Sequence, residues 1–387
     1  MASDDGVVAM RLAILGCGYV ANMYRLTLSA HPHLELVGVY DRERSRAETM
    51  ARLTGARAYE AFEDLCDDDS SIVLNLTNPG EHYETTRALL EAGKHVYSEK
   101  PLAMRLDEAR ALVDLAEARG LLLSGAPCTL LGPVAQTAWR ALRAGAIGPV
   151  RLVYAEMEDG MVSRAPTAKW INEAGTGWPA VDEFETGCTV EHAGYVLSWL
   201  CAFFGPAHAV SAYSDVLLAD KTPGVRLRPA PDFSVAAIRF EAGVTARMTN
   251  GIYAEHDHRL RFFGDDGVLT VADPRSDRST VTVRRYRTIR RRRFLGPARR
   301  LKLIGGRERI AAYRGSQTRD FCRALADMAV AIEEGRPPYL GARFSLHVTE
   351  LTLAAHYGAQ ETGAALGDAV GGPYAVETRF PPLEPLS

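Results

Sequence analysis

A short apolar stretch that runs directly into a turn of small residues restricts the fold of this chain most. Leu12–Leu15 is apolar and too short for a buried helix, which favours a buried strand of a parallel sheet. Gly16, Gly18 and Ala21 follow in the spacing Gly-x-Gly-x-x-Ala, and a helical pattern begins near Tyr19. The first glycine permits a tight turn, the second lets a pyrophosphate approach the backbone, and the alanine allows close helix–strand packing. The stretch therefore predicts a strand–turn–helix unit that can bind a dinucleotide.

The motif alone also fits a glycine turn without a ligand, so the following sequence has to decide. Leu34–Tyr40 is typical of a second strand and ends at Asp41, close to the ~20 residues after the glycines at which an acid binds the adenosine ribose. An ionised Asp41 repels a 2′-phosphate, which favours NAD, whereas Arg42 and Arg44 leave NADP open. Further cofactor contacts are expected from the turn residues Cys17, Tyr19 and Val20.

Length and composition set the broad class. A chain of 387 residues is long enough for two domains, and 47% hydrophobic with 24% charged residues is ordinary for a soluble protein. No apolar run approaches the ~18 residues of a membrane-spanning helix. Met1–Gly6 lacks the features of a secretory signal and is expected to be a loose tail. The six scattered cysteines form no Cys-x-x-Cys pair, which indicates buried thiols in a reducing cytoplasm.

One histidine pair has a spacing that could supply two ligands of a metal site. His256 and His258 are separated only by Asp257, at the spacing of two side chains on one face of a strand. No further ligand cluster can be placed beside them from the sequence, so no metal site is expected.

Strand and helix signals alternate through the first ~125 residues. Apolar strand signals at Ile72–Leu76 and His95–Ser98 are each followed by a helical stretch. Repeated units of this kind indicate a doubly wound parallel sheet, so residues 1–126 are predicted to be an NAD(P)-binding Rossmann domain. Ligands of such sheets lie beyond the carboxyl ends of the strands. The residues expected there, besides the glycine turn and Asp41, are Thr77, Asn78, Pro79, Glu99 and Lys100.

The pattern changes after residue 126. Consecutive strand signals begin at Val150–Glu158 and are joined by turns ending at Gly243 and Gly267, which favours an antiparallel sheet. Gln317–Glu333 and Phe344–Gln360 read as amphipathic helices. Residues 127–387 are therefore predicted to be an α+β domain with a large, mainly antiparallel open sheet, serving substrate binding and oligomerisation.

At Glu99-Lys100-Pro101 the chain resembles the glucose–fructose oxidoreductase / inositol dehydrogenase / MocA family. The residues that carry the resemblance are Gly16–Ala21, Thr77-Asn78-Pro79 with His82, and His95–Ala103. The resemblance implies an NAD(P)-binding fold whose C-terminal sheet faces the nicotinamide, with His82 in the cofactor loop. It also implies oxidation or reduction of a sugar or cyclitol hydroxyl, contact of Lys100 with that hydroxyl, and a dimer or tetramer joined through the sheet.

The chain departs from this family at one helix. The family usually carries Asp, three residues and then a catalytic His there; aligned on Gly205-Pro206, this chain has Glu191 and Tyr195. These two share a helix face, with His192 one residue off it. A phenol can relay a proton, so Lys100 and Tyr195 are expected to act as a pair oriented by Glu191. Two other interpretations stay open: Tyr195 is only a packed helix residue, or His192 is the acid–base group.

The loop before this helix mixes aromatic and ionic side chains, a mixture that suits sugars. Its members are Lys169, Trp170, Asn172, Trp178, Asp182 and Glu185. A polar surface loop with one or two buried tryptophans explains any single member equally well.

A run of basic residues follows a late strand signal. Arg284–Lys302 holds nine arginines, one lysine and no carboxylate, so it carries +10 while the rest of the chain carries −13. Three interpretations of Arg284–Arg300 compete: a solvated loop, an anion clamp for a phosphorylated or nucleotide-linked sugar, and docking on an anionic membrane or nucleic acid. Nucleic acid ranks last, because the run has no series of aromatic residues for base stacking.

Taken together, these features predict a cytoplasmic NAD(P)-dependent oxidoreductase acting on a sugar, cyclitol or sugar conjugate. One alternative is a lyase, epimerase or glycoside-cleaving enzyme that uses transient oxidation with tightly held NAD. Another is a non-catalytic NAD-binding regulatory protein.

Overall fold

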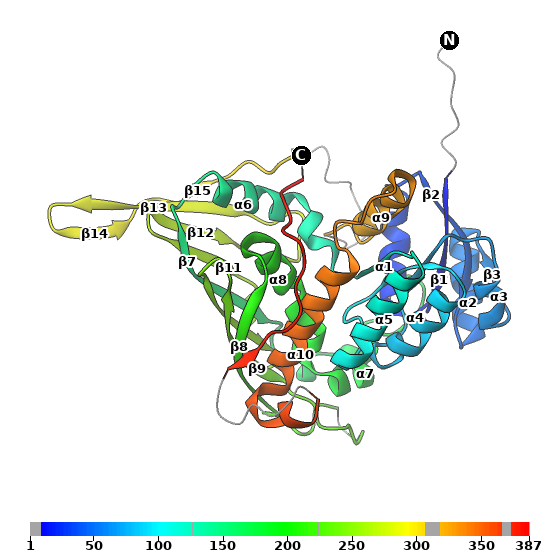
Figure 1. Cartoon of the computed structure of the whole chain (residues 1–387). Helices are drawn as coiled ribbons and strands as arrows, with labels where there is room; N and C mark the ends of the chain where they lie inside the picture. Colours follow the sequence, from blue (N-terminus) through cyan, green and yellow to red (C-terminus); the bar gives the residue numbers. More distant parts are fainter. Residues whose placement is uncertain (1–8, 126, 223, 306–317, 366–372, 387) are drawn as a thin grey trace, which may run out of the picture. The chain divides into compact units, whose positions relative to one another are not determined.

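The computed structural model describes residues 9–125, 127–222, 224–305, 318–365 and 373–386. The chain divides into two compact units (Figure 1). The first unit comprises Met1–Cys128, Ala168–Trp178 and Tyr313–Ser345. The second comprises Thr129–Thr167, Pro179–Ala312 and Leu346–Ser387. Two later segments thus group with the residues around the glycine turn. Met1–Gly6 lies outside the described residues.

The first unit contains a six-stranded parallel sheet in the order β3-β2-β1-β4-β5-β6, a doubly wound arrangement. Its strands are β1 Met10–Leu15, β2 Leu34–Tyr40, β3 Arg57–Ala58, β4 Ile72–Asn75, β5 His95–Ser98 and β6 Leu123–Gly125. Its first helices are α1 Tyr19–Leu28, α2 Arg44–Thr54, α3 Phe62–Cys66, α4 His82–Glu91 and α5 Leu106–Ala118, with a 3₁₀ turn η1 at Pro79–Glu81. The predicted Rossmann fold is confirmed.

Burial explains why these segments form these elements. Leu12–Leu15 is almost completely buried, as expected for a strand covered on both faces of a parallel sheet. Ala21 is fully buried in α1, which fits the predicted close packing of that helix. Helix α2 ends at Gly55, whose φ of 80° is left-handed, a conformation that glycine adopts without a steric penalty.

The late helix of the first unit begins later than the sequence predicted. Gln317 lies outside the described residues, and α9 spans Arg323–Glu334 rather than starting near residue 317. The side chain of Asp320 accepts a 3.0 Å hydrogen bond from the backbone N–H of Cys322. A local bond of this kind competes with helical backbone bonding, which explains the delayed start. Phe321 instead packs edge-on against Tyr24 of α1, with ring centroids 5.3 Å apart.

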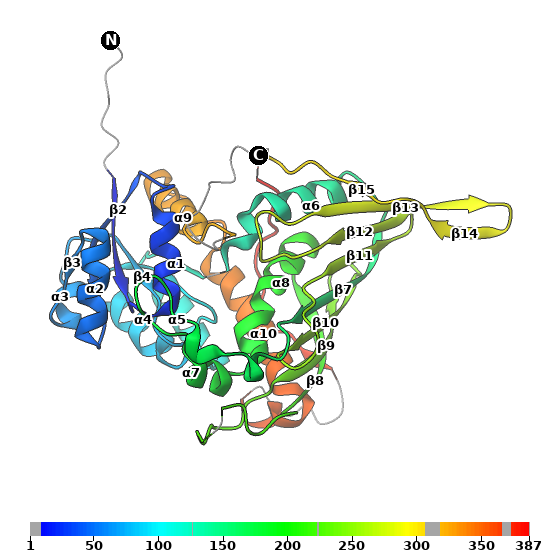
Figure 2. The same cartoon turned by 180° about the vertical axis from the view of Figure 1, so that it is seen from behind.

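The second unit is built on a ten-stranded sheet (Figure 2). The strands are β7 Val150–Glu158, β8 Ala207–Asp215, β9 Phe233–Phe240, β10 Thr245–Gly251, β11 Leu260–Gly264, β12 Gly267–Val271, β13 Val281–Ile289, β14 Arg292–Leu295, β15 Arg299–Arg300 and β16 Tyr374–Ala375. The order is β14-β13-β12-β11-β7-β10-β9-β8-β16, with β15 on β13. Among the described pairs, β7 and β10 are parallel and the others antiparallel, so the predicted mainly antiparallel sheet is confirmed.

Helices cover one face of this sheet. The helices of the unit are α6 Pro133–Arg143, α7 Ala180–Thr186, α8 Cys188–Phe204 and α10 Ala342–Ala365, whose first four residues belong to the first unit. Helix α8 contacts β7, β9 and β10, and it is buried on almost every side. Its Trp199 is fully buried and donates a 3.1 Å hydrogen bond from Nε1 to Thr129. This packing fixes the position of the helix that carries Glu191 and Tyr195.

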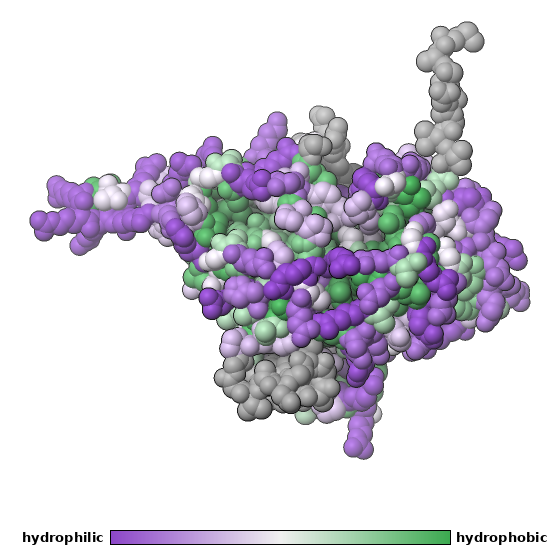
Figure 3. Space-filling model, viewed as in Figure 1, coloured by the Kyte–Doolittle hydropathy of each residue, from purple (hydrophilic) through white to green (hydrophobic). Residues whose placement is uncertain are grey.

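The arginine run is strand rather than loop. Arg284–Arg300 covers most of β13, all of β14 and β15, and the turn between them, so the predicted loop is wrong. β13 and β14 pair from Tyr286–Leu295 to Ile289–Arg292 in an antiparallel hairpin. Its surface is hydrophilic over most of its length (Figure 3). Pairing between the strands satisfies the backbone N–H and C=O groups of the hairpin. The arginine side chains remain largely exposed.

Two further predictions concern the whole chain. All six cysteines are free, and all but the partly buried Cys66 are buried, as the sequence indicated. Among the described helices, none combines the length and the apolar character that crossing a bilayer requires.

Candidate functional site

The glycine turn has the geometry of an anion cradle. Gly16 has a φ of 93°, and a Cβ at this position would lie 2.7 Å from the carbonyl oxygen of Leu76, so no larger residue fits. Gly18 is the N-cap of α1, and a Cβ there would meet no atom within 4 Å. The first turn of α1 contains no acidic side chain that would compete for its backbone N–H groups. The first turn of α1 therefore offers its N-terminal N–H groups, and Gly18 leaves open space, to a phosphate.

The carboxyl ends of four strands lie in one row beside this turn. Leu15 pairs with Tyr40 on one side and with Asn75 on the other, and Asn75 pairs with Ser98. The residues that follow them continue the row: the N–H of Gly16 donates to Tyr40 at 2.8 Å, and that of Glu99 donates to Asn75 at 2.9 Å. The turn, Asp41 and the residues after β4 and β5 thus share one edge of the sheet.

Asp41 is held at this edge by two backbone donors. Its Oδ2 accepts the N–H of Cys17 at 2.7 Å, and its Oδ1 accepts the N–H of Glu43 at 2.8 Å. A carboxylate has further lone pairs, so both ribose hydroxyls can still donate to it. Arg44 bonds to Glu48 at 3.0 Å and to Glu60 at 2.8 Å. This engagement leaves the exposed Arg42 as the better placed of the two arginines for a 2′-phosphate.

Buried polar side chains brace the loops after β4 and β5. The carbonyl oxygen of the Asn75 side chain accepts bonds from the N–H and the hydroxyl of Thr77, at 3.2 and 2.8 Å. The ring nitrogens of His82 lie 2.6 Å from the carbonyl oxygen of Pro101 and 3.0 Å from that of Thr77. Full burial lowers the pKa of His82. The buried His82 ring therefore lies between the two loops, with one ring nitrogen near a carbonyl oxygen of each.

Lys100 is the second residue after β5 and is joined to Pro101 by a cis peptide bond. The residue before it, Glu99, is buried and accepts a 2.6 Å hydrogen bond from the hydroxyl of Tyr24 in α1. The other oxygen of Glu99 accepts the backbone N–H of Lys100 at 3.3 Å. Glu99 thus anchors the backbone of Lys100 to the same helix that begins at the glycine turn.

The structure divides the predicted substrate loop. Lys169, Trp170, Asn172 and Trp178 belong to the first unit, and Asp182 and Glu185 belong to α7 of the second. Asn172 donates a 3.2 Å hydrogen bond to the carbonyl oxygen of Tyr19, and the rings of Trp170 and Trp178 meet edge-on at 5.1 Å. The first part of the loop therefore lies at the start of α1.

The acidic members of that loop have different surroundings. Asp182 is exposed, whereas Glu185 accepts hydrogen bonds from the backbone and the guanidinium of Arg228, at 2.9 and 2.8 Å.

In the second unit, helix α8 carries a second polar cluster. Nε2 of His192 lies 3.0 Å from Oδ2 of Asp159, the residue directly after β7. Arg275, which follows β12, donates a 2.8 Å hydrogen bond to Oδ1 of the same carboxylate. The guanidinium carbon of Arg275 lies 5.1 Å from the centre of the Tyr195 ring. His192 and Tyr195 are three residues apart, so both face the Asp159–Arg275 pair, while Glu191 is buried in the same helix.

Burial and charge act in opposite directions on Asp159. Burial alone would raise its pKa, but His192, His258 and Arg275 together lower it well below the usual value. Burial acts to lower the pKa of His258, but the carboxylates of Asp159 and Asp273 raise this pKa overall. Burial and the negative charges of Glu156 and Asp159 raise the pKa of Glu158 to about 7.

Sequence reasoning missed Asp159 and Arg275. Asp159 carried a usable signal, because it directly follows the predicted strand Val150–Glu158, and polar residues at strand ends are candidates for sites. Arg275 carried none, since its contact with Tyr195 joins residues from different parts of the sheet domain. Lys100 and Tyr195 belong to different units, so their pairing stays a prediction.

Comparisons with known proteins agree with this architecture. A family model described as an oxidoreductase family with an NAD-binding Rossmann fold matches residues 10–126, and one for the GFO/IDH/MocA C-terminal domain matches residues 135–270. An uncharacterized oxidoreductase of Synechocystis is 25% identical over 272 residues, which are 68% of this chain and 71% of that protein. Rabbit trans-1,2-dihydrobenzene-1,2-diol dehydrogenase is 31% identical over 166 residues, 42% of this chain and only 50% of the enzyme.

Solved structures show the same fold at lower identity. The WlbA dehydrogenase of Bordetella pertussis, solved with NADH and UDP-GlcNAcA, matches with a TM-score of 0.67 and 18% identity, covering 90% of this chain and 95% of the other. A 3-ketoreductase of Actinomadura kijaniata, solved with NADP, matches with a TM-score of 0.68 and 22% identity, covering 90% and 97%.

Proposed function

Because the chain belongs to the GFO/IDH/MocA oxidoreductase family, we propose that it transfers a hydride between a nicotinamide cofactor and a hydroxyl-bearing carbon of a sugar, cyclitol or sugar conjugate. The observation that carries the proposal is the row of strand ends in the first unit. It sets the glycine turn, Asp41 and Lys100 along one edge of a Rossmann sheet. A phosphate cradle, a ribose acceptor and a proton-transfer group are the three parts that such a reaction needs.

The residues present fit NAD. The turn from Gly16 to Gly18 and the N-terminus of α1 would hold the pyrophosphate, since a side chain at Gly18 would fill the space left open there. Asp41 would accept the ribose hydroxyls and repel a 2′-phosphate, with Arg42 as the group that would tolerate NADP. When bound, the cofactor supplies the nicotinamide carbon that accepts or returns the hydride.

The chain itself has to manage the proton. During oxidation the substrate carbon loses a hydride and its hydroxyl loses a proton, which we assign to Lys100 and Tyr195 together. Glu191 would orient one of them, and His192 is the alternative acid–base group because it contacts Asp159 beside Tyr195. Lys169, Trp170 and Trp178 from the first unit and Asp182 from the second are proposed substrate contacts.

Relatives support a sugar conjugate as substrate. A Streptomyces violaceoruber relative, 36% identical over 154 residues, is a dTDP-3,4-didehydro-2,6-dideoxy-alpha-D-glucose 3-reductase. Another, from Bacillus subtilis and 34% identical over 107 residues, is a glucose-6-phosphate 3-dehydrogenase. Both act on a ring carbon of a phosphorylated or nucleotide-linked sugar by their names, which favours that substrate class for this chain.

The test begins by identifying any dinucleotide that co-purifies with the chain. NADH formation is then followed across free, phosphorylated and nucleotide-linked sugars. Formation of NADH with one of them is expected; conversion of a sugar without net NADH would instead favour the lyase or epimerase alternative, and cofactor binding with neither would favour a regulatory protein. Tyr195→Phe and Lys100→Ala should each lower kcat by ~10²–10⁴, and the proton assignment is wrong if both stay within about twofold.

Self-association through the sheet is a further part of the proposal. The sheet face opposite α8 carries partly exposed side chains at alternate positions, among them Tyr154, Arg247 and Phe263. Arg247 lies 4.2 Å over the Tyr154 ring, and Tyr154 meets Phe263 edge-on at 4.9 Å. Aromatic and arginine side chains are enriched at interfaces, which supports a homodimer or homotetramer. Light scattering checks it: Phe263→Glu should shift the chain towards the monomer.

The arginine hairpin is best explained as a solvated arm. Arg284 and Arg285 donate to the carbonyl oxygens of Gly296 and Ala146, at 2.9 and 3.0 Å. These bonds take up two guanidinium groups within the second unit itself. Charge reversal of Arg291–Arg293 should change neither the affinity for nucleotide-linked sugars nor binding to anionic vesicles. A loss of affinity for nucleotide-linked sugars would favour the anion clamp, and a loss of vesicle binding would favour the membrane contact.

The six free cysteines support a cytoplasmic location.

A further inference from the structure

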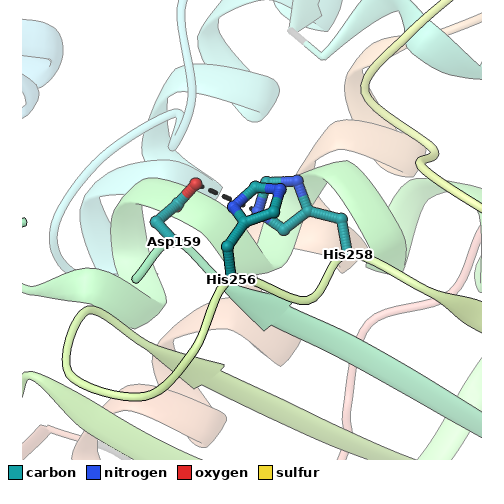
Figure 4. Close-up of side chains that lie close together, drawn as sticks. All are labelled: Asp159, His256 and His258. Carbon is teal, nitrogen blue, oxygen red and sulfur yellow. Dashed lines mark ion pairs between the residues drawn. The ribbon is translucent and has the colours of Figure 1, made fainter. Parts of the chain in front are cut away.

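Two histidines and an aspartate meet at one end of the second unit's sheet (Figure 4). Asp159 directly follows β7, and His256 and His258 lie in the segment between β10 and β11. The backbones of Glu158 and Asp257 exchange two hydrogen bonds, of 3.0 and 2.9 Å, which bring the two segments side by side. One potential ligand atom from each of Asp159, His256 and His258 can be chosen so that all three lie within 4.8 Å of one another.

The strand-like bridge decides which side chains face the cluster. His256 and His258 are two residues apart, so they project to the same side of the extended segment. The carboxylate of the intervening Asp257 instead accepts a 2.6 Å hydrogen bond from the guanidinium of Arg259. The sequence showed the histidine pair but no third ligand, and strand pairing supplies one in Asp159.

The short contact between Asp159 and His258 is an ion pair that lacks the alignment of a good hydrogen bond. Nε2 of His258 lies 3.0 Å from Oδ1 of Asp159, yet Nε2 of His258 and Oδ2 of Asp159 have no hydrogen-bond partner among the residues that the structure describes. The His258 side chain is only 5% exposed, so water does not readily compensate. Ligand atoms around an ion with bonds of about 2.0–2.2 Å are separated by roughly this distance and need no mutual alignment.

Surrounding residues hold two of the three side chains, Asp159 and His258, as outer partners of a metal site do. Arg275 donates a 2.8 Å hydrogen bond to Oδ1 of Asp159, and Oδ2 lies 3.0 Å from Nε2 of His192. Each carboxylate oxygen has two lone pairs, so Asp159 can still ligate a metal ion. On the far side of the His258 ring, Nδ1 lies 3.6 Å from Oδ1 of Asp273. A carboxylate behind one ring nitrogen orients the other nitrogen towards a metal.

A cluster of ion pairs without a metal explains the histidine pair less well. The rings of His256 and His258 have centroids only 4.1 Å apart. An ion pair between Asp159 and His258 does not account for His256 beside it, whereas a metal ion that both imidazoles ligate does.

We propose that Asp159, His256 and His258 bind one divalent transition-metal ion, with zinc the best match to two imidazoles and one carboxylate. Three protein ligands leave a fourth position open to water or to another group. His192 contacts the same carboxylate, so the ion lies beside the face of α8 that also carries Tyr195. The site is independent of the dinucleotide cradle, because every ligand comes from the second unit.

The untagged chain, treated with a chelator and dialysed, is titrated with Co²⁺ and followed by visible absorbance. We expect visible absorption bands of bound Co²⁺ that saturate at one equivalent of the metal. Addition of Zn²⁺ should remove these bands. His256→Ala and His258→Ala should each weaken Co²⁺ binding by at least tenfold. His208→Ala, a histidine of the same unit on β8, should leave it unchanged.

Thermal melts of each metal-free variant show whether weaker Co²⁺ binding comes from the missing ligand or from an unfolded chain. His256 is exposed, so its replacement removes no buried packing and keeps the test valid if His258→Ala unfolds. The proposal is overturned if the wild-type chain shows no saturable bands, or if His256→Ala binds Co²⁺ as tightly as His208→Ala. Neither result depends on substrate or NAD, so failure here is distinct from failure of the proposed oxidoreductase activity.

Discussion

The guanidinium carbon of Arg275 lies 5.1 Å from the centre of the Tyr195 ring, and Nη1 of Arg275 donates a 2.8 Å hydrogen bond to Asp159. One side chain thus joins the candidate acid–base residue of α8 to the carboxylate at the end of β7. A cation over an aromatic face is attracted to it, most strongly where water is excluded. We therefore expect Arg275 to position Tyr195.

Replacing Arg275 tests this role. Arg275→Gln should lower kcat by about 10- to 100-fold with KM changed by less than about threefold, because Tyr195 loses its restraint while the substrate contacts remain. Arg275→Lys, which keeps the positive charge, should recover part of the loss. Steady-state kinetics check both variants. Arg278→Gln, an exposed arginine of the same turn, is the control, and an equal effect there would show that Arg275 has no special role.

Alanine substitutions at Gly16 and Gly18 should affect different properties, stability in the first case and NADH binding in the second. Gly16→Ala introduces a Cβ 2.7 Å from a backbone oxygen at a φ of 93°, so it should lower the free energy of unfolding by roughly 1–3 kcal/mol. Gly18→Ala meets no atom within 4 Å, so it should leave the melting temperature nearly unchanged but weaken NADH binding at least tenfold. Thermal melts and NADH fluorescence titrations separate the two. Wild-type NADH affinity in Gly18→Ala would mean that the pyrophosphate lies elsewhere.

Asp41 should set the choice between NAD and NADP. Asp41→Asn keeps an acceptor for the N–H of Cys17 but removes the charge that repels a 2′-phosphate. The ratio of the NADP to the NAD dissociation constant should fall by about 10-fold or more, which corresponds to roughly 1.4 kcal/mol per tenfold. Calorimetric titration with both cofactors measures it. The neighbouring Glu43→Gln removes a charge nearby, and an equal change there would assign the effect to net charge alone.

Buried neutral histidines should make the chain sensitive to mild acid. Burial lowers the pKa of His356 and of His347 to about 4 from 6.5. Between these values the unfolded chain binds protons that the folded chain does not, so stability present above pH 6.5 is lost as the pH falls towards 4. His356→Leu also removes a buried Nδ1 that has no hydrogen-bond partner among the described residues.

Urea unfolding at about pH 7.5 and about pH 5 measures this effect. The wild-type chain should lose more unfolding free energy between the two than His356→Leu, by roughly 1–2 kcal/mol. His208→Leu is the control. Equal losses in the wild-type chain and in His356→Leu would mean that His356 takes up a proton as readily in the folded chain as in the unfolded chain.

The cofactor half of the site was predictable because its information is local. Each strand of a parallel sheet ends at the same edge, so residues that directly follow strand signals must meet there. Gly16, Asp41 and Lys100 were placed this way, and the register from Leu15 to Ser98 agrees. The braces below them, such as Asn75 and His82, were harder to interpret, because burial of a polar side chain has no local signature.

The second unit was predictable only in outline. Its strands and hairpin turns follow from alternating patterns, but the partners of a strand depend on which distant segments pair. The arginine run was misread as a loop because charged residues are frequent in loops, whereas backbone pairing with β12 and within the hairpin makes it strand. The start of α9 was placed too early because one Asp320 side chain redirects the local backbone.

The sequence by itself determined the Rossmann sheet, the conformation of the glycine turn and the presence of a mainly antiparallel sheet later in the chain, since each depends on neighbouring residues and on periodicity. Only the tertiary structure decided what surrounds Tyr195 and the histidine pair. Asp159 reaches His258 through a strand bridge between segments about a hundred residues apart, and Arg275 reaches Tyr195 from beyond β12. Contacts of this range are set by sheet register and helix packing, which no short stretch of sequence encodes.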